Sequence, residues 1–273
     1  MTDDPPPQLI RSLVDGPSRI AGFEWHASTT STNAVATAAA RRGAPEWHVV
    51  AADEQTAGRG RADRTWSAPA GTSLLLSIVL RPTVPAERLP LLPLLAGMAL
   101  AEVVEAHVEV AAADVALKWP NDVLVRGDAL QPWRKVAGIL IEVPQPGMAI
   151  LGIGCNVDWH DHEPPRGGPG GLGAASLAEV KGAPVDRWRV LAALLGVLGN
   201  RYDLWCDLPG AFLDGYRRRC ATLGQEVVVT RPAAAPLIGT ATAVADDGAL
   251  EVRTGAGARV RVSAGDVTHV RPT

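Results

Sequence analysis

The chain has 273 residues, 47% of them hydrophobic and 20% charged, which is enough apolar side chain for a sizeable core and suggests about two domains. The formal net charge of −3 argues against a general nucleic-acid-binding surface, because such surfaces carry a basic face. Cys155, Cys206 and Cys220 fit neither a disulfide framework nor a zinc site, which favours a reducing compartment such as the cytoplasm. No signal peptide and no run of 18 apolar residues is found, so we expect no membrane association.

The N-terminal part is expected to contain short elements. Residues 1–8 include three consecutive prolines and no hydrophobic period, which predicts a disordered tail. A short helix with a turn is expected within residues 9–22, and a strand at 23–26. An alanine-rich helix follows from about residue 34 to 42, where Gly43 is a natural stop.

Three polar residues stand immediately before that helix: Ser31, Thr32 and Asn33. Their side chains can cap the helix by accepting hydrogen bonds from its first N–H groups. A helix N-terminus also presents donors to a polar ligand, so the same residues can bind one. From these residues alone both interpretations stay open.

The most distinctive stretch, which we call the Gly/Arg loop, runs from Gln55 to Trp66 after a strand expected at 48–52. Gly58 and Gly60 permit positive φ and a close approach of the backbone to a ligand. Arginine presents a planar fork of donors to phosphate or carboxylate, and Trp66 offers a flat ring for stacking. The loop therefore suits a ligand with several negative charges, and the alternative is a solvated basic turn. Its three arginines are Arg59, Arg61 and Arg64.

Two strongly apolar elements follow the loop. Residues 74–80 form a near-continuous apolar run, which predicts a strand buried on both faces. Residues 91–106 carry a wide apolar stripe at helical spacing. No phosphate-binding fingerprint of the P-loop or Rossmann type occurs in the sequence.

The next motif reads Lys-Trp-Pro-Asn-Asp and begins at Lys118. Because Pro120 lacks a backbone donor, we expect a kink that directs Asn121 and Asp122 out of the sheet. One interpretation is a plain turn. The other is a carboxylate and an amide that hold Mg²⁺ and polar ligand atoms beside the lysine.

A third motif places Lys135 at the start of a buried strand that contains Gly138. Glycine inside a strand often marks the close approach of a ligand or another backbone. The adjoining strand is expected at 148–157 and includes Asn156. On its own, Lys135 also fits a solvated charge at a strand end.

The remainder of the chain predicts a loop, two helices and a β-domain. Residues 160–175 are rich in Pro and Gly, and His160-Asp161-His162 lacks further ligands at a metal-binding spacing. Asp186 is expected to cap a helix that ends near residue 205, and 209–219 resembles a shorter amphipathic helix. Short strands are expected at 227–229, 238–244, 250–253 and 259–262, with a hairpin signal at Asp247-Gly248.

Four motifs in this order resemble the biotin protein ligases. The resemblance covers about residues 20–205 and extends to the C-terminal part. Each motif is weak alone, but the ordered set is specific. The four are the Gly/Arg loop, Lys118 to Asp122, Lys135 to Leu140, and Gly152 to Val157.

The resemblance implies an α+β fold. Residues 9–221 would form a catalytic domain similar to class II aminoacyl-tRNA synthetases, with a mixed sheet flanked by helices. Residues 222–273 would form a small SH3-like β-domain. The regulatory members of the family carry an N-terminal DNA-binding domain, for which this sequence shows no candidate segment, so we expect a monofunctional ligase.

The resemblance also implies ligands and roles. Biotin would bind to Ser31, Thr32, Asn33, Gln55, Gly58, Arg59, Gly60, Arg61, Lys135 and Gly138. ATP would bind to Arg61, Arg64, Trp66, Asn121, Asp122 and Asn156. The catalytic residues would be Lys135, Arg59, Lys118 and Asp122, and Asp122 would also bind Mg²⁺.

The implied reaction has two steps. Biotin and ATP would form biotinyl-5′-AMP, and the biotinyl group would pass to a lysine of a biotin carboxyl carrier domain in an acyl-CoA or pyruvate carboxylase. Two alternatives remain: a lipoate–protein ligase, which uses the same adenylate chemistry, and a biotin-binding protein that keeps the fold without catalysis. A nucleic-acid partner is not expected.

Overall fold

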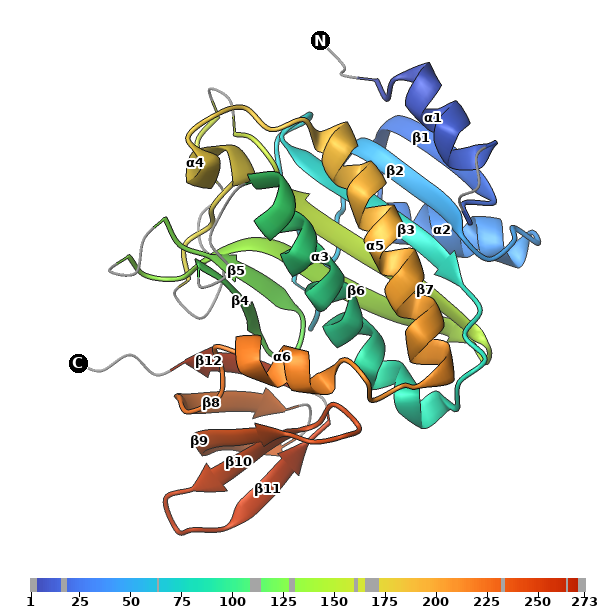
Figure 1. Ribbon diagram of the computed structural model, residues 1–273. Helices are drawn as coiled ribbons and strands as arrows, with labels where there is room; N and C mark the ends of the chain where they lie inside the picture. Colours follow the sequence, from blue (N-terminus) through green and yellow to red (C-terminus); the bar gives the residue numbers. More distant parts are fainter. Residues whose placement is uncertain are drawn as a thin grey trace.

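The computed structural model describes residues 4–15, 19–62, 64–108, 114–127, 131–159, 162–164, 172–231, 234–263 and 265–269. Within these residues the strands form one seven-stranded and one five-stranded sheet (Figure 1). The N-terminal elements are α1 (Pro7–Val14), β1 (Gly22–Thr29), α2 (Thr32–Arg41), β2 (His48–Gln55) and β3 (Ser73–Leu80). The middle elements are η1 (Ala86–Leu91), α3 (Leu92–Val108), β4 (Val115–Lys118), β5 (Asp122–Val125), β6 (Arg134–Gln145) and β7 (Met148–Asn156).

The larger sheet has the strand order β1-β2-β3-β7-β6-β5-β4. β1 and β2 run parallel, and the other neighbours are antiparallel, so the sheet is mixed, as expected. All eight residues of β3 are buried, which confirms the strand predicted at 74–80. α3 and α5 (Arg187–Asp207) lie across one face in Figure 1, and the short α4 (Leu177–Lys181) lies near their ends.

The alternating side chains of β3 divide the core into two parts. Leu74, Leu76 and Ile78 join the main core, which also contains the buried residues of α3 and α5. Val79 faces the other way and packs with Ala36 of α2 in a smaller cluster. Since successive side chains of a strand point to opposite faces, α2 covers the face opposite α3 and α5.

The stretch from Ala86 to Ala106 is long and apolar enough by composition to cross a membrane, but most of it is buried inside the protein. α3 owes this apolar character to its position on the large sheet, where it also packs against the neighbouring α5 (Figure 1). α5 begins at its expected cap, where the Asp186 carboxylate accepts hydrogen bonds from the backbone N–H groups of Trp188 and Arg189.

The smaller sheet has the strand order β11-β10-β9-β8-β12, and α6 (Leu213–Arg219) lies between the two sheets in Figure 1. Gly248 forms the expected turn with φ +85°, and its carbonyl accepts a hydrogen bond from Trp119 Nε1 at 2.8 Å. The two sheets are therefore joined by specific contacts. The strands are β8 (Glu226–Arg231), β9 (Ala234–Val244), β10 (Leu250–Thr254), β11 (Arg259–Val262) and β12 (Asp266–His269).

Three details differ from the sequence-based expectations. α1 begins at Pro7, inside the stretch expected to be a disordered tail, because proline is well suited to the first turn of a helix. Pro120 and Asn121 do not kink one strand out of the sheet but form the turn of the β4–β5 hairpin, in which Lys118 pairs with Asp122. β12 was not expected, and it forms an edge of the smaller sheet.

Candidate active site

A cavity of about 360 Å³ opens on the α2 side of the large sheet. Gly152 and Gly154 of β7 form part of its floor, since alternate residues of a strand share one face and glycine carries no side chain. Ser77 of β3 pairs with Gly152. Gly138 of β6 pairs with Gly154 of β7 and continues this floor. Small residues at these positions leave the space that large apolar side chains fill elsewhere in the sheet.

One end of the cavity is lined by uncharged hydrogen-bonding groups. Gln55 Oε1 accepts hydrogen bonds from Thr32 N at 2.8 Å and from Thr32 Oγ1 at 3.1 Å. Ser77 Oγ lies 2.8 Å from Thr32 Oγ1 and 2.5 Å from Asn33 Oδ1. Ser31 occupies the N-cap position of α2 without a side-chain capping bond, so capping does not explain these residues. All three residues, 31 to 33, are buried beside the cavity.

The Gly/Arg loop folds as a tight hairpin across the cavity. Gly58 O accepts a hydrogen bond from Trp66 N at 2.9 Å, and Gly60 N donates to Arg64 O at 2.6 Å. Positive φ does not explain the two glycines, since among the described residues of this hairpin the positive φ is that of Ala62, at +51°. A Cβ on Gly58 would lie 2.3 Å from Trp66 O, so close backbone packing is what requires glycine there.

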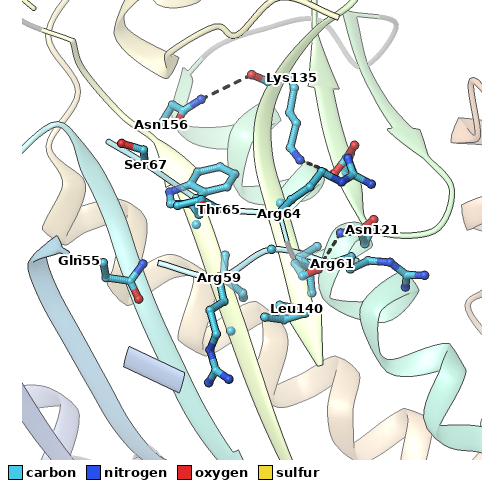
Figure 2. A pocket seen from close by; sticks show the side chains of 18 of the residues that line it. Gln55, Arg59, Arg61, Arg64, Thr65, Ser67, Asn121, Lys135, Leu140 and Asn156 are labelled. Atoms are coloured by element: carbon cyan, nitrogen blue, oxygen red, sulfur yellow. Dashed lines mark hydrogen bonds and ion pairs between the residues drawn. The ribbon is translucent and has the colours of Figure 1, made fainter. Parts of the chain in front are cut away.

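Each loop arginine contacts an acceptor elsewhere in the protein. Arg59 Nη2 donates to Glu142 Oε2 at 2.9 Å, Arg61 Nη2 donates to Gly265 O at 3.1 Å, and Arg64 forms an ion pair with Asp266. Burial lowers the pKa of Arg61, and the nearby carboxylate of Asp266 opposes this shift. Figure 2 shows Arg59 on the opposite side of the cavity from Lys135 and Asn156.

Trp66 lies on the glycine floor. A Cβ on Gly154 would fall 2.6 Å from Trp66 Cε2, and one on Gly138 would fall 3.1 Å from Trp66 Cζ3. Lys135 Nζ lies 5.5 Å from the centroid of the ring, within the range of a cation–π contact. The close approach expected at Gly138 is therefore made by an indole ring in this structure.

Two lysines share one carboxylate. Lys135 Nζ lies 2.6 Å from Asp122 Oδ1, and Lys118 Nζ lies 3.8 Å from Asp122 Oδ2. Burial lowers the pKa of Lys118, and the nearby Asp122 carboxylate offsets only part of this shift. Burial also lowers the pKa of His269 on β12 to about 4, and Lys118 contributes to that shift, so this imidazole is neutral at pH 7. The cationic end of the cavity thus carries two ammonium groups around one acid.

The side-chain amides of Asn121 and Asn156 donate hydrogen bonds to backbone carbonyls. Asn121 Nδ2 donates to Ile139 O at 2.8 Å, and Asn156 Nδ2 donates to Ala175 O at 3.0 Å. Both side chains also line the cavity. Among the described residues, no group of three His, Cys, Asp or Glu side chains can hold a metal ion, and His160 and Asp161 lie outside those residues.

The structure brings most of the candidate residues around one cavity. The residues that line it are Ser31, Thr32, Asn33, Gln55, Arg59, Gly60, Arg61, Arg64, Trp66, Asn121, Asp122, Lys135, Gly138 and Asn156. Lys118 reaches the site through Asp122, and Gly58 shapes the loop. Sequence reasoning missed Ser77, Glu142 and Asp266. The period-2 spacing of Glu142 from Gly138, which places both on one face of β6, was the available signal.

Comparisons with known proteins agree with this geometry. The chain matches the Biotin/lipoate A/B protein ligase family over residues 25–158 and the Biotin protein ligase C terminal domain over residues 222–270. A biotin--[acetyl-CoA-carboxylase] ligase of Mycobacterium tuberculosis is 39% identical, and the match covers 97% of each chain. A bifunctional ligase/repressor of Bacillus subtilis is 36% identical over 65% of this chain, which spans 53% of that protein.

A solved structure titled biotin protein ligase from Aquifex aeolicus in complex with biotin and ATP superposes with a TM-score of 0.72. It is 26% identical, and the match covers 92% of this chain and 99% of that one. The fold and the site therefore define a carboxylate-activating ligase. The chain belongs to the biotin protein ligase family, which confirms the resemblance of the four motifs.

Proposed function

We propose that the protein joins biotin to a biotin carboxyl carrier domain in two steps, with ATP as co-substrate. The observation that carries this proposal is the polarity of the cavity. Uncharged hydrogen-bonding groups line one end, as a ring with N–H and C=O groups requires, and cationic groups line the other. The relative solved with biotin and ATP supports both substrates.

In the first step a carboxylate oxygen of biotin attacks the α-phosphorus of ATP, the bond to the β-phosphate breaks, and pyrophosphate leaves. Two anions must approach each other, which costs about 4 kcal/mol at ~4 Å and an effective dielectric of ~20. Lys135, Lys118 and Arg61 supply fixed positive charge at this end of the cavity. We assign them to the stabilisation of charge on the phosphates and the carboxylate.

In the second step the neutral amine of a carrier lysine attacks the carbonyl carbon of biotinyl-5′-AMP, the bond from that carbon to the phosphate oxygen breaks, and AMP leaves. The amine nitrogen gives up one proton as the amide forms. Asp122 lies beside both lysines and is our candidate for orienting the incoming amine. Acyl-CoA and pyruvate carboxylases contain the kind of carrier that fits. The named activity of the M. tuberculosis relative supports an acetyl-CoA carboxylase.

Mg²⁺ is assigned to the substrate rather than to a resident site. Each oxygen of Asp122 already faces a lysine, and no metal-binding cluster occurs in the described segments. These residues do not fit a protein-held ion, although a single carboxylate is compatible with MgATP bound mainly through its phosphates. No catalytic step needs a metal held by the protein alone.

We also assign the protein as a monofunctional ligase that acts in the cytoplasm. The free cysteines and the net charge of −3 support a reducing compartment and the absence of a nucleic-acid partner. We also propose that residues 9–221 act as the catalytic domain and 222–273 as the β-domain. The family match over residues 222–270 supports that division.

The experiment that tests this function is biotin-dependent exchange of labelled pyrophosphate into ATP, with lipoate as the control acid. Exchange with biotin alone supports the proposal. Exchange with lipoate alone identifies a lipoate ligase, and biotin binding without exchange identifies a non-catalytic binding protein.

The Gly/Arg loop is expected to resist trypsin when ligands are bound. Arg59 and Arg64 lie in a short hairpin whose anion-binding side chains point to the cavity side, so bound anions disfavour its local opening. At ligand concentrations ten times the Kd, cleavage at these arginines should slow about tenfold. Cleavage after exposed Arg42, at the far end of α2, serves as the control. Equal cleavage rates with and without biotin and ATP would contradict ordering of the loop.

A further inference from the structure

A continuous chain of hydrogen bonds links the uncharged end of the cavity to the Gly/Arg loop. It runs from Gln55 through Thr32 and Ser77 to Asn33. Asn33 Nδ2 then donates to Glu142 Oε2 at 2.7 Å, and Arg59 Nη2 donates to the same oxygen at 2.9 Å. The last member, Arg59, lies in the loop that Gln55 opens, so the chain of contacts closes on itself.

This inference rests on the proposed function. We propose that Glu142 is a positioning residue that couples the biotin ring pocket to the Gly/Arg loop by orienting Arg59. One carboxylate oxygen of Glu142 accepts hydrogen bonds from two side chains that have different roles. Asn33 faces the ring end of the cavity, and Arg59 belongs to the anion-binding loop.

The Asn33 contact is rigid. Its side chain belongs to a residue that is 4% exposed, and a Cβ on Gly152 would fall 2.2 Å from Asn33 Oδ1. Ser77 holds Oδ1, so the amide nitrogen must face Glu142. A buried amide donor that loses its acceptor is costly, and Glu142 is therefore fixed from the pocket side.

The contact between Arg59 and Glu142 uses only part of the guanidinium. The side chain of Arg59 is 46% exposed, and within the described residues its guanidinium donates only through Nη2 to Glu142. Guanidinium has five N–H donors, so the remaining ones stay available to a bound ligand while Glu142 stays in place. Glu142 thus orients Arg59 without competing for every donor, and it reduces the conformational freedom that Arg59 would otherwise lose on binding.

Two substitutions separate these contacts. Glu142→Gln keeps an acceptor for Asn33 but removes the charge that orients Arg59, so the KM for biotin should rise about threefold. Glu142→Ala also leaves the Asn33 amide without its acceptor, so the KM should rise about tenfold or more. Because Glu142 touches no reacting atom, kcat in pyrophosphate exchange should stay within about threefold, since an exposed ion pair is worth little.

A double-mutant cycle tests whether Glu142 acts through Arg59. In an Arg59→Ala background, Glu142→Gln should no longer change the KM for biotin, because the partner is already absent. Glu102→Gln, which breaks the Arg201–Glu102 pair between α3 and α5, is the matched control and should leave this KM unchanged. An equal rise of KM in both backgrounds would overturn the proposal.

A second readout is independent of turnover. Without ligands, Glu142→Gln should accelerate modification of Arg59 by phenylglyoxal several-fold, as measured by mass spectrometry, because the guanidinium loses its carboxylate partner. An unchanged modification rate would also reject the positioning role. If wild-type protein shows no exchange with biotin, the proposed function fails, whereas normal wild-type exchange with an additive cycle rejects only the role of Glu142.

Discussion

Replacement of Lys135 by alanine is expected to slow biotin-dependent pyrophosphate exchange by about 10³-fold, the magnitude seen when one fixed electrostatic contact to a developing charge is removed. Lys135 Nζ stands at the cationic end of the cavity, 2.6 Å from Asp122 and 5.5 Å from the Trp66 ring. Its loss removes the positive charge and leaves Asp122 facing the phosphates with only Lys118, at 3.8 Å. The biotin carboxylate and the nucleotide phosphates then approach each other with less positive charge to offset their repulsion.

The measurement is the exchange rate at saturating biotin and ATP, with Lys181→Ala on α4 as the control. Lys181 lies outside the cavity, so its substitution should leave exchange unchanged. A wild-type rate in the Lys135→Ala protein would refute the role of Lys135 in adenylate formation. Thermal denaturation of both variants separates this effect from a loss of folded protein.

Replacement of Gly154 by alanine is expected to lower kcat/KM for ATP about 100-fold. The added Cβ would fall 2.6 Å from Cε2 and 2.8 Å from Cζ2 of Trp66, closer than these atoms can approach. The indole must then leave the glycine floor and move relative to Lys135. A displacement of about 1 Å in a positioned group can cost ~10²-fold in rate.

Steady-state exchange at varied ATP gives this value. Gly196→Ala on α5 is the matched control, because its added Cβ meets nothing within 4 Å and alanine favours the helix by about 0.5–1 kcal/mol. If Gly154→Ala retains the wild-type kcat/KM for ATP, the position of Trp66 does not matter for nucleotide use.

Much of the fold can be predicted from local patterns. The apolar run at 74–80 becomes the fully buried β3, and Asp186 caps α5 as expected. These features depend on neighbours in sequence. The four motifs could be gathered into one site only through the family resemblance, because their contacts join strands that are distant in the chain.

The features that were missed are tertiary. Glu142 meets Asn33 across 109 positions, and the partner of a strand residue cannot be read from its own strand. β12 is four residues long and begins with an acid, so its pattern resembles a turn. Gly58 was expected to permit positive φ and a close approach to a ligand, but the requirement for glycine comes from the carbonyl of Trp66 across the hairpin.

The placement of Asp266 against Arg64 has a consequence for ionic strength. A protein carboxylate already neutralises this arginine, so the pair presents little net charge to an approaching nucleotide phosphate. Where an exposed arginine attracts a phosphate across water, added salt screens the attraction. The edge strand of the small sheet thus acts as a built-in counterion, and the affinity for ATP should depend only weakly on salt concentration.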